Sequence, residues 1–120
     1  PKTVNDLSKH SFISYGRGAP SPVFNPDWAL KLGMKDGKKR KTVMKVNSVY
    51  GLLLAVQSGV GIAALPDYLT VNVPNIVKAL PKIEGPITEA HFVYPQSLKN
   101  VARVQAFRNF LYSKISEWKF

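Results

Sequence analysis

The chain has 120 residues, of which 45% are hydrophobic, 17 are Lys or Arg and 7 are Asp or Glu. This length allows one domain or a piece of one, with a core of modest size, and the net charge of +10 favours contact with polyanions. The absence of cysteine excludes disulfides, thiol catalysis and cysteine-bound zinc.

The first third of the chain predicts strands and helices joined by turns. Residues 1–10 have weak patterning and are expected to form a peripheral lead-in, and residues 11–15 favour a short strand. Residues 19–26 carry three prolines, which is typical of a loop. Residues 27–32 favour a short helix, and residues 41–46 alternate as a strand does.

A capped helix and a buried strand are predicted next. Asn47 and Ser48 supply side-chain oxygens that can cap a helix start. A one-sided apolar stripe then follows at helical spacing: Val49, Leu52, Leu53, Val56 and Val60. Gly59 falls where a helix favours a left-handed terminator, and residues 61–65 form an apolar run of strand length.

The second half predicts two more strands and a long helix. Residues 66–69 can form a helical turn, and residues 75–80 and 87–94 are expected as strands. Residues 101–118 favour one helix, whose apolar face carries Val104, Phe107, Leu111, Ile115 and Trp118. This alternation of strands and helices with buried runs indicates an α/β fold.

Two motifs in this order carry a family resemblance. The first is VQSGVGIAALP at residues 56–66; the second is HFVYP at residues 91–95, followed after a spacer by VQAFRNFL. Together they resemble the effector-binding domain of LysR-type transcriptional regulators. The resemblance implies a periplasmic-binding-protein-like lobe, with a mixed sheet flanked by helices and a long C-terminal helix. It also implies that residues 1–90 form the second lobe, and that residues 91–120 are the returning strand and C-terminal helix of the first lobe.

The join between the strand at 41–46 and the next helix is a candidate binding site. In open α/β sheets ligands bind beyond the carboxyl ends of the strands, and the free amides of a helix start attract small anions. Asn47 and Ser48 would add directional hydrogen bonds, unless they only cap the helix. The resemblance implies effector contact just before this helix. The predicted ligand-binding residues are Asn47, Ser48, Val46, Tyr15 and Ser14; for Tyr15, core packing is an equal alternative.

Catalytic and metal signatures are missing from the sequence. His10 and His91 have no partner at metal-ligand spacing, and the carboxylates are scattered. The serines lack the GxSxG pattern, and Gly59-Val60-Gly61 is not followed by the Lys-Ser/Thr of a phosphate loop. We therefore expect no enzyme activity, no cofactor and no metal.

Residues 35–41 form a basic run with five Lys or Arg. A solvated turn and an anion-contacting patch both fit this pattern. No aromatic residue is interleaved for base stacking.

The leading interpretation is a C-terminal fragment of a bacterial LysR-type regulator that binds a small, anionic metabolite at an interlobe cleft. The expected partners are this effector, a second copy through the last helix, and DNA through an absent N-terminal domain. No apolar run reaches the ~20 residues that span a bilayer, and a polar start without Met indicates a processed or truncated cytoplasmic chain. A stand-alone solute-binding half domain and a basic module that binds polyanions or nucleic acids are the alternatives.

Overall fold

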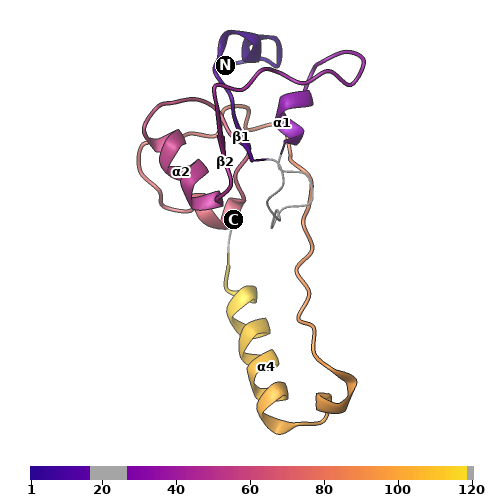
Figure 1. Ribbon diagram of the computed structural model, residues 1–120. Coiled ribbons are helices and arrows are strands. Elements are labelled where there is room, and N and C mark those ends of the chain that lie inside the picture. The colour runs from indigo at the N-terminus through magenta and orange to yellow at the C-terminus, as the bar shows by residue number, and fades with distance from the viewer. Residues whose placement is uncertain (17–26, 119–120) are drawn as a thin grey trace. The chain divides into compact units, whose positions relative to one another are not determined.

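The computed structural model describes residues 1–16 and 27–118, so the predicted loop at 19–26 lies outside the described residues. The chain divides into two compact units, Pro1–Thr88 and Glu89–Phe120. The first unit contains η1 (Asn5–Lys9), β1 (Ile13–Tyr15), α1 (Trp28–Lys31), β2 (Met44–Val46), α2 (Val49–Gln57) and α3 (Asp67–Thr70) (Figure 1). The second unit contains η2 (Gln96–Leu98) and α4 (Ala102–Ser116).

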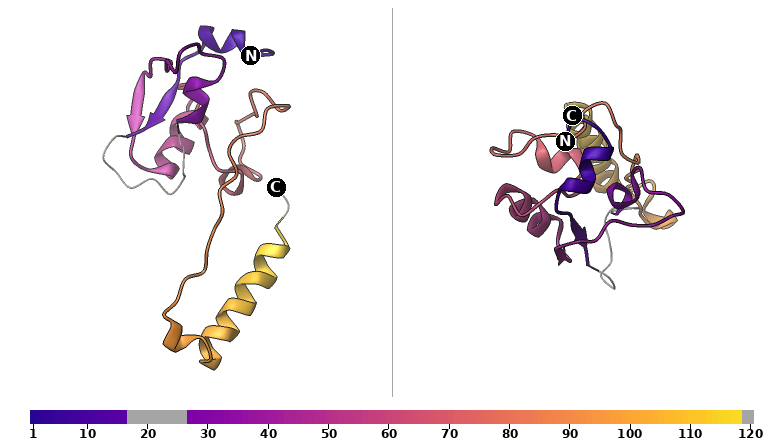
Figure 2. Two further views of the ribbon diagram at one scale, coloured as in Figure 1. Left: turned by 90° about the vertical axis from the view of Figure 1, so that its right-hand side faces the viewer. Right: turned by 90° about the horizontal axis from the view of Figure 1, so that it is seen from above.

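β1 is the central segment of a small parallel sheet. It pairs with β2 in the register that sets Tyr15 opposite Val46, and the two strands lie side by side in Figure 2. On its other edge Phe12 forms a parallel bridge with Ile62, where the Ile13 amide donates to the Ile62 carbonyl at 2.9 Å. Among the described residues all strand pairings are parallel, whereas the resemblance implies a mixed sheet.

Helices cover both faces of β1. On one face Phe12, which is 1% exposed, forms a core cluster with Leu7 of η1 and Leu30 of α1. Successive side chains of a strand point to opposite faces, so the buried Ile13 faces the other way. There α2 packs against β1 and buries Leu52 and Leu53. Figure 1 shows α1 and α2 on opposite sides of the strands. The first unit is therefore an α/β layer with a helix on each face.

The N-terminal segment is part of the core, and the prediction of a peripheral lead-in was wrong. Leu7 of η1 is 3% exposed and packs against Phe12. One buried leucine in a polar segment leaves no periodicity for a sequence to reveal. The Asp6 carboxylate fixes the start of η1, because it accepts hydrogen bonds from the Thr3 amide at 2.8 Å and the Lys2 amide at 3.0 Å.

The predicted helices are confirmed, with ends that shift by one or two residues. Val60, predicted on the apolar stripe of the second helix, instead lies beyond the end of α2 and is 39% exposed. Ser48 is the N-cap of α2, and its side chain accepts a hydrogen bond from the Gly51 amide. Gly59 has a φ of +74°, so the predicted left-handed terminator is confirmed. The helical turn at 66–69 is α3, and the long C-terminal helix is α4.

Two predicted strands were wrong, and a third is reduced to one bridge. Residues 75–80 and 87–94 form no strand. The backbone of Asn75 has a φ of +63°, and Val77 and Ile87 are 91% and 92% exposed. The run at 61–65 pairs with β1 only at Ile62. A strand forms only where another strand supplies hydrogen bonds, and an apolar run does not reveal whether one is present.

In the second unit, the segment before η2 packs on α4 through aromatic side chains. The Phe92 ring lies 5.6 Å from the Phe107 ring of α4 and 5.4 Å from the Tyr94 ring, measured between centroids. All of α4 lies within the described residues, and none of its side chains is buried. This leaves large apolar side chains exposed on α4, namely Phe107, Phe110, Tyr112 and Ile115.

Candidate functional site

The carboxyl ends of β1 and β2 meet at one edge of the sheet. Tyr15 is opposite Val46, and the amide of Gly16 donates to the Val46 carbonyl at 2.9 Å. A Cβ atom on Gly16 would lie 3.3 Å from the Cβ of Asn47. The strand pairing therefore places Tyr15 and Gly16 directly beside Val46 and Asn47.

The helices that follow these two strands cover opposite faces of the sheet. Among the described residues, the next helix after β1 is α1, which packs on the Phe12 face through Leu30. The next helix after β2 is α2, which packs on the other face, as Figure 1 shows. In open α/β sheets ligands bind outside the carboxyl ends of the strands, so this edge is a candidate binding position.

The N-terminus of α2 adds positive potential at this edge. The Ser48 hydroxyl accepts the Gly51 amide at 3.3 Å, and the Ser48 carbonyl accepts the Leu52 amide at 3.0 Å. The amides of Val49 and Tyr50 belong to the first turn, where no intrahelical acceptor exists. With the helix dipole, these amides favour a negatively charged group near the strand ends.

Ser48 therefore has the capping role that the sequence left open, and Asn47 lies outside the helix with an exposed side chain. Capping uses only an acceptor lone pair of the Ser48 hydroxyl, which keeps its own proton as a hydrogen-bond donor. The same side chain can hold the helix start and donate to an anion.

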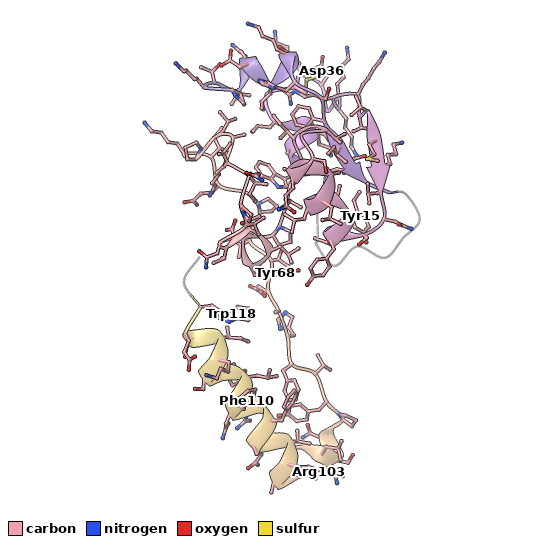
Figure 3. The ribbon with its side chains drawn as sticks, turned by 90° about the vertical axis from the view of Figure 1, so that its left-hand side faces the viewer. Tyr15, Asp36, Tyr68, Arg103, Phe110 and Trp118 are labelled. Atoms are coloured by element: carbon pink, nitrogen blue, oxygen red, sulfur yellow. The ribbon has the colours of Figure 1, made fainter. Side chains whose placement is uncertain are left out.

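The two predicted site residues of β1, Tyr15 and Ser14, do not contribute equally to this edge. Tyr15 is half-buried and lies at the end of the first unit remote from Asp36 (Figure 3). Ser14 is 4% exposed, is in register with Lys45, and shares the Phe12 face of β1. The structure thus brings together four of the five predicted site residues, Tyr15, Val46, Asn47 and Ser48, while Ser14 is buried one position before them.

Sequence reasoning missed two contributors to this edge. A Cβ atom on Gly51 would lie 2.6 Å from the Val46 Cγ1 atom, so this glycine lets the first turn of α2 approach the end of β2. An isolated glycine inside a helical pattern was the available signal. Lys45 is exposed one position before Val46 and adds positive charge there.

Two hollows of the described surface lie away from this edge. One of about 420 Å³ is lined by residues that include Lys9, His10 and Gly61, close to where β1 begins. Another of about 190 Å³ in the second unit is lined by residues that include Phe92 and Tyr112.

Within residues 1–16 and 27–118, no group of three or more His, Asp or Glu could hold a metal ion. No helix in this part of the chain is both long and apolar enough to span a membrane.

One family model matches nearly the whole chain. It is the LysR substrate binding domain, and the match covers residues 1–115. Comparison with curated proteins and with solved structures finds no match.

Proposed function

The chain belongs to the LysR substrate-binding domain family, and from this premise we propose that it is the effector-sensing part of a bacterial LysR-type transcriptional regulator. The family assignment supports a regulatory domain that binds a small-molecule effector. The observation that carries the proposal is the meeting of the β1 and β2 ends with the start of α2, where Tyr15 faces Val46 and Ser48 caps the helix.

The effector that fits this edge is a small anion. The first-turn amides of α2 and the Ser48 hydroxyl supply donors, and the exposed Asn47 amide can reach a second group of the ligand. Tyr15 would form an aromatic wall beside them, and Val46 would contribute an apolar neighbour. Ser14, which is 4% exposed, would act through the position of Tyr15 rather than by direct contact.

We further propose that residues 1–90 are the second lobe of the effector domain and that residues 91–120 belong to its first lobe. The exposed apolar side chains of α4 support this assignment, because such a helix is stable only when another surface covers it. In this arrangement the rest of the first lobe and a DNA-binding domain belong to a longer polypeptide that acts in the cytoplasm. A second copy of the chain is the other surface that could cover α4.

The effector would regulate by binding one arrangement of the two lobes more tightly than another. A ligand shifts a conformational equilibrium only by the difference between its affinities for the two states. An anion held between the α2 start and the opposing lobe would favour the closed arrangement. That change would then alter the geometry of the regulator on DNA.

Ser48→Asp in the intact regulator tests the site. Aspartate is as good an N-cap as serine, so α2 should be retained. Its negative charge lies where the anion would bind, so affinity should fall at least ~10-fold, which corresponds to ~1.4 kcal/mol. The measurement is thermal-shift titration with a panel of small carboxylates and phosphates, followed by calorimetry on the compound that shifts the wild type most.

Asn47→Ala should weaken binding of the same compound. Asn100→Ala, at another exposed asparagine, should leave that binding unchanged. Normal binding by both Ser48→Asp and Asn47→Ala would remove these residues from the site. DNA binding by the intact regulator should be unchanged in all three variants.

A further inference from the structure

Positive charge is concentrated in the connection between α1 and β2. Residues 31–45 contain seven Lys or Arg but a single acidic residue, Asp36. The six lysines are all exposed: Lys31, Lys35, Lys38, Lys39, Lys41 and Lys45. More than half of the net charge of +10 therefore lies on this stretch, which runs from the last residue of α1 into β2.

The tip of this connection is a tight turn with a defined backbone. The Lys38 amide donates to the Lys35 carbonyl at 3.2 Å, and the two central residues, Asp36 and Gly37, have φ values of +56° and +67°. Two positive φ angles in an Asp-Gly pair are the signature of a type I′ turn. Lys35 and Lys38 are thus held on either side of an ordered turn.

Arg40 anchors the base of the turn and leaves the lysines pointing outward. Its Nη1 atom donates to the Leu32 carbonyl at 2.6 Å, and its guanidinium lies 5.4 Å from the centre of the Phe12 ring. Its own amide donates to the Leu30 carbonyl at 2.9 Å. Within the part of the chain that the structure describes, one lysine of the connection forms an ion pair, Lys39 with Asp27 at a long 3.7 Å.

We propose that Lys35, Lys38, Lys39 and Lys41 form a contact surface for the phosphate backbone of double-stranded DNA. The connection contains no aromatic residue to stack on bases and no helix to enter a groove. Lysine is a point charge on a flexible stem, which suits phosphates at variable positions rather than the fixed edges of bases. The contact is therefore electrostatic and independent of DNA sequence.

The choice of DNA over other polyanions rests on the proposed function, because a LysR-type regulator would hold this domain near its operator. The surface is also remote from the candidate effector site. Figure 3 places Asp36, at the tip of the turn, and Tyr15 at opposite ends of the first unit. Both surfaces could therefore be occupied at once.

The experiment measures binding of the 120-residue chain to a fluorescent duplex of mixed sequence by anisotropy, without effector, from about 50 to about 200 mM salt. Four phosphate contacts give a slope of log K against log salt of about −3.6, so affinity should fall about 100-fold over this range. The combined variant Lys35→Ser, Lys38→Ser, Lys39→Ser and Lys41→Ser should bind at least ~10-fold more weakly at the lowest salt, with a slope near zero.

A matched control removes the same number of charges from other exposed positions: Lys78→Ser, Lys82→Ser, Lys99→Ser and Arg103→Ser. It should keep the wild-type slope. Equal loss in both variants would overturn the proposal, because net charge alone would then explain binding. Absence of duplex binding by the wild type, or binding to anionic vesicles with none to the duplex, would also overturn it.

A footprint on the unmodified chain avoids any effect of the substitutions on folding. Lysine acetylation with and without the duplex should show protection at Lys35, Lys38, Lys39 and Lys41 but not at Lys78 or Lys82. Uniform protection would contradict the proposal. Because no effector is present, failure here would leave the effector site untested and intact as a separate proposal.

Discussion

At the scale of single residues, Arg40 links the basic connection to the core. Its guanidinium donates to the Leu32 carbonyl at 2.6 Å and lies over the Phe12 ring. The carbonyls near the C-terminus of a helix have no intrahelical partners, so this arginine supplies a hydrogen-bond donor that the end of α1 lacks. A planar guanidinium can bond to a carbonyl and stack on a ring at the same time, which an ammonium group cannot do.

Arg40→Lys should therefore destabilise the first unit although it keeps the charge. We expect the free energy of unfolding to fall by about 1–2 kcal/mol, the usual cost of a lost part-buried hydrogen bond. Urea unfolding followed by circular dichroism measures this change. The reciprocal substitution Lys41→Arg, at the exposed neighbour, should stay within about 0.5 kcal/mol. Similar midpoints for both variants would show that Arg40 has no structural role.

At the scale of secondary-structure elements, η1 depends on one carboxylate. Hydrogen bonds from the Thr3 amide, the Thr3 hydroxyl and the Lys2 amide hold the pKa of Asp6 below its ordinary value. A carboxyl whose pKa is lowered by folding stabilises the folded state above the ordinary pKa. That contribution is lost as the pH falls through the lowered pKa. Since η1 carries Leu7 into the core, acid should loosen the N-terminal segment first.

Asp6→Asn should make the pH dependence of stability shallower in this acid range. At neutral pH the variant should be less stable than the wild type, because a neutral amide accepts hydrogen bonds more weakly than a carboxylate. Urea midpoints measured from neutral pH into the acid range test this, with Asp67→Asn as control. Parallel curves for the wild type and Asp6→Asn would contradict the assigned role.

The accuracy of prediction from sequence also differs between kinds of element. The helices were predictable because their signals are local: Ser48 caps α2, and Gly59 ends it with a positive φ. The strands were less predictable, because strand pairing joins residues that are distant in the sequence, such as Phe12 and Ile62. The runs at 75–80 and 87–94 resemble strands but lack partners among the described residues.

The same distinction applies to the candidate site. The join of β2 and α2 was predictable from Asn47 and Ser48, since strand, cap and helix follow one another in the chain. The burial of Ser14 and the close approach of Gly51 to Val46 were not, because both depend on packing between elements. Whether an effector contacts the five predicted residues stays a prediction.

At the scale of the whole molecule, the two units differ in the packing that stabilises each of them. The first has a core cluster built on Phe12, with Leu7 and Leu30. In the second, α4 has no buried residue, and the contact of Phe92 with Phe107 joins it to the preceding segment. Most helical stability in proteins comes from packing of an apolar face, so α4 should open far more readily than α2.

Phe92→Ala should loosen the second unit and leave the first unchanged. Loss of the aromatic pair costs about 0.5–1.5 kcal/mol beyond the lost burial, so amides of α4 should exchange faster while those of α2 do not. Hydrogen exchange read by mass spectrometry separates the two. Phe110→Ala removes an exposed aromatic ring from the same helix and should have a smaller effect. Faster exchange throughout Pro1–Thr88 would show that the units unfold together.

The central position of β1 has a consequence for synthesis on the ribosome. β1 is translated early, but the Val43 amide that binds the Phe12 carbonyl comes much later, and Ile62, which closes the other edge, later still. At about 5–20 residues per second, the apolar segment around Phe12 and Ile13 waits several seconds for its partners. During that interval it is an unpaired, strand-forming segment, the kind of nascent sequence that chaperones shield. Slow or paused translation between residues 16 and 62 should therefore lower the yield of folded chain.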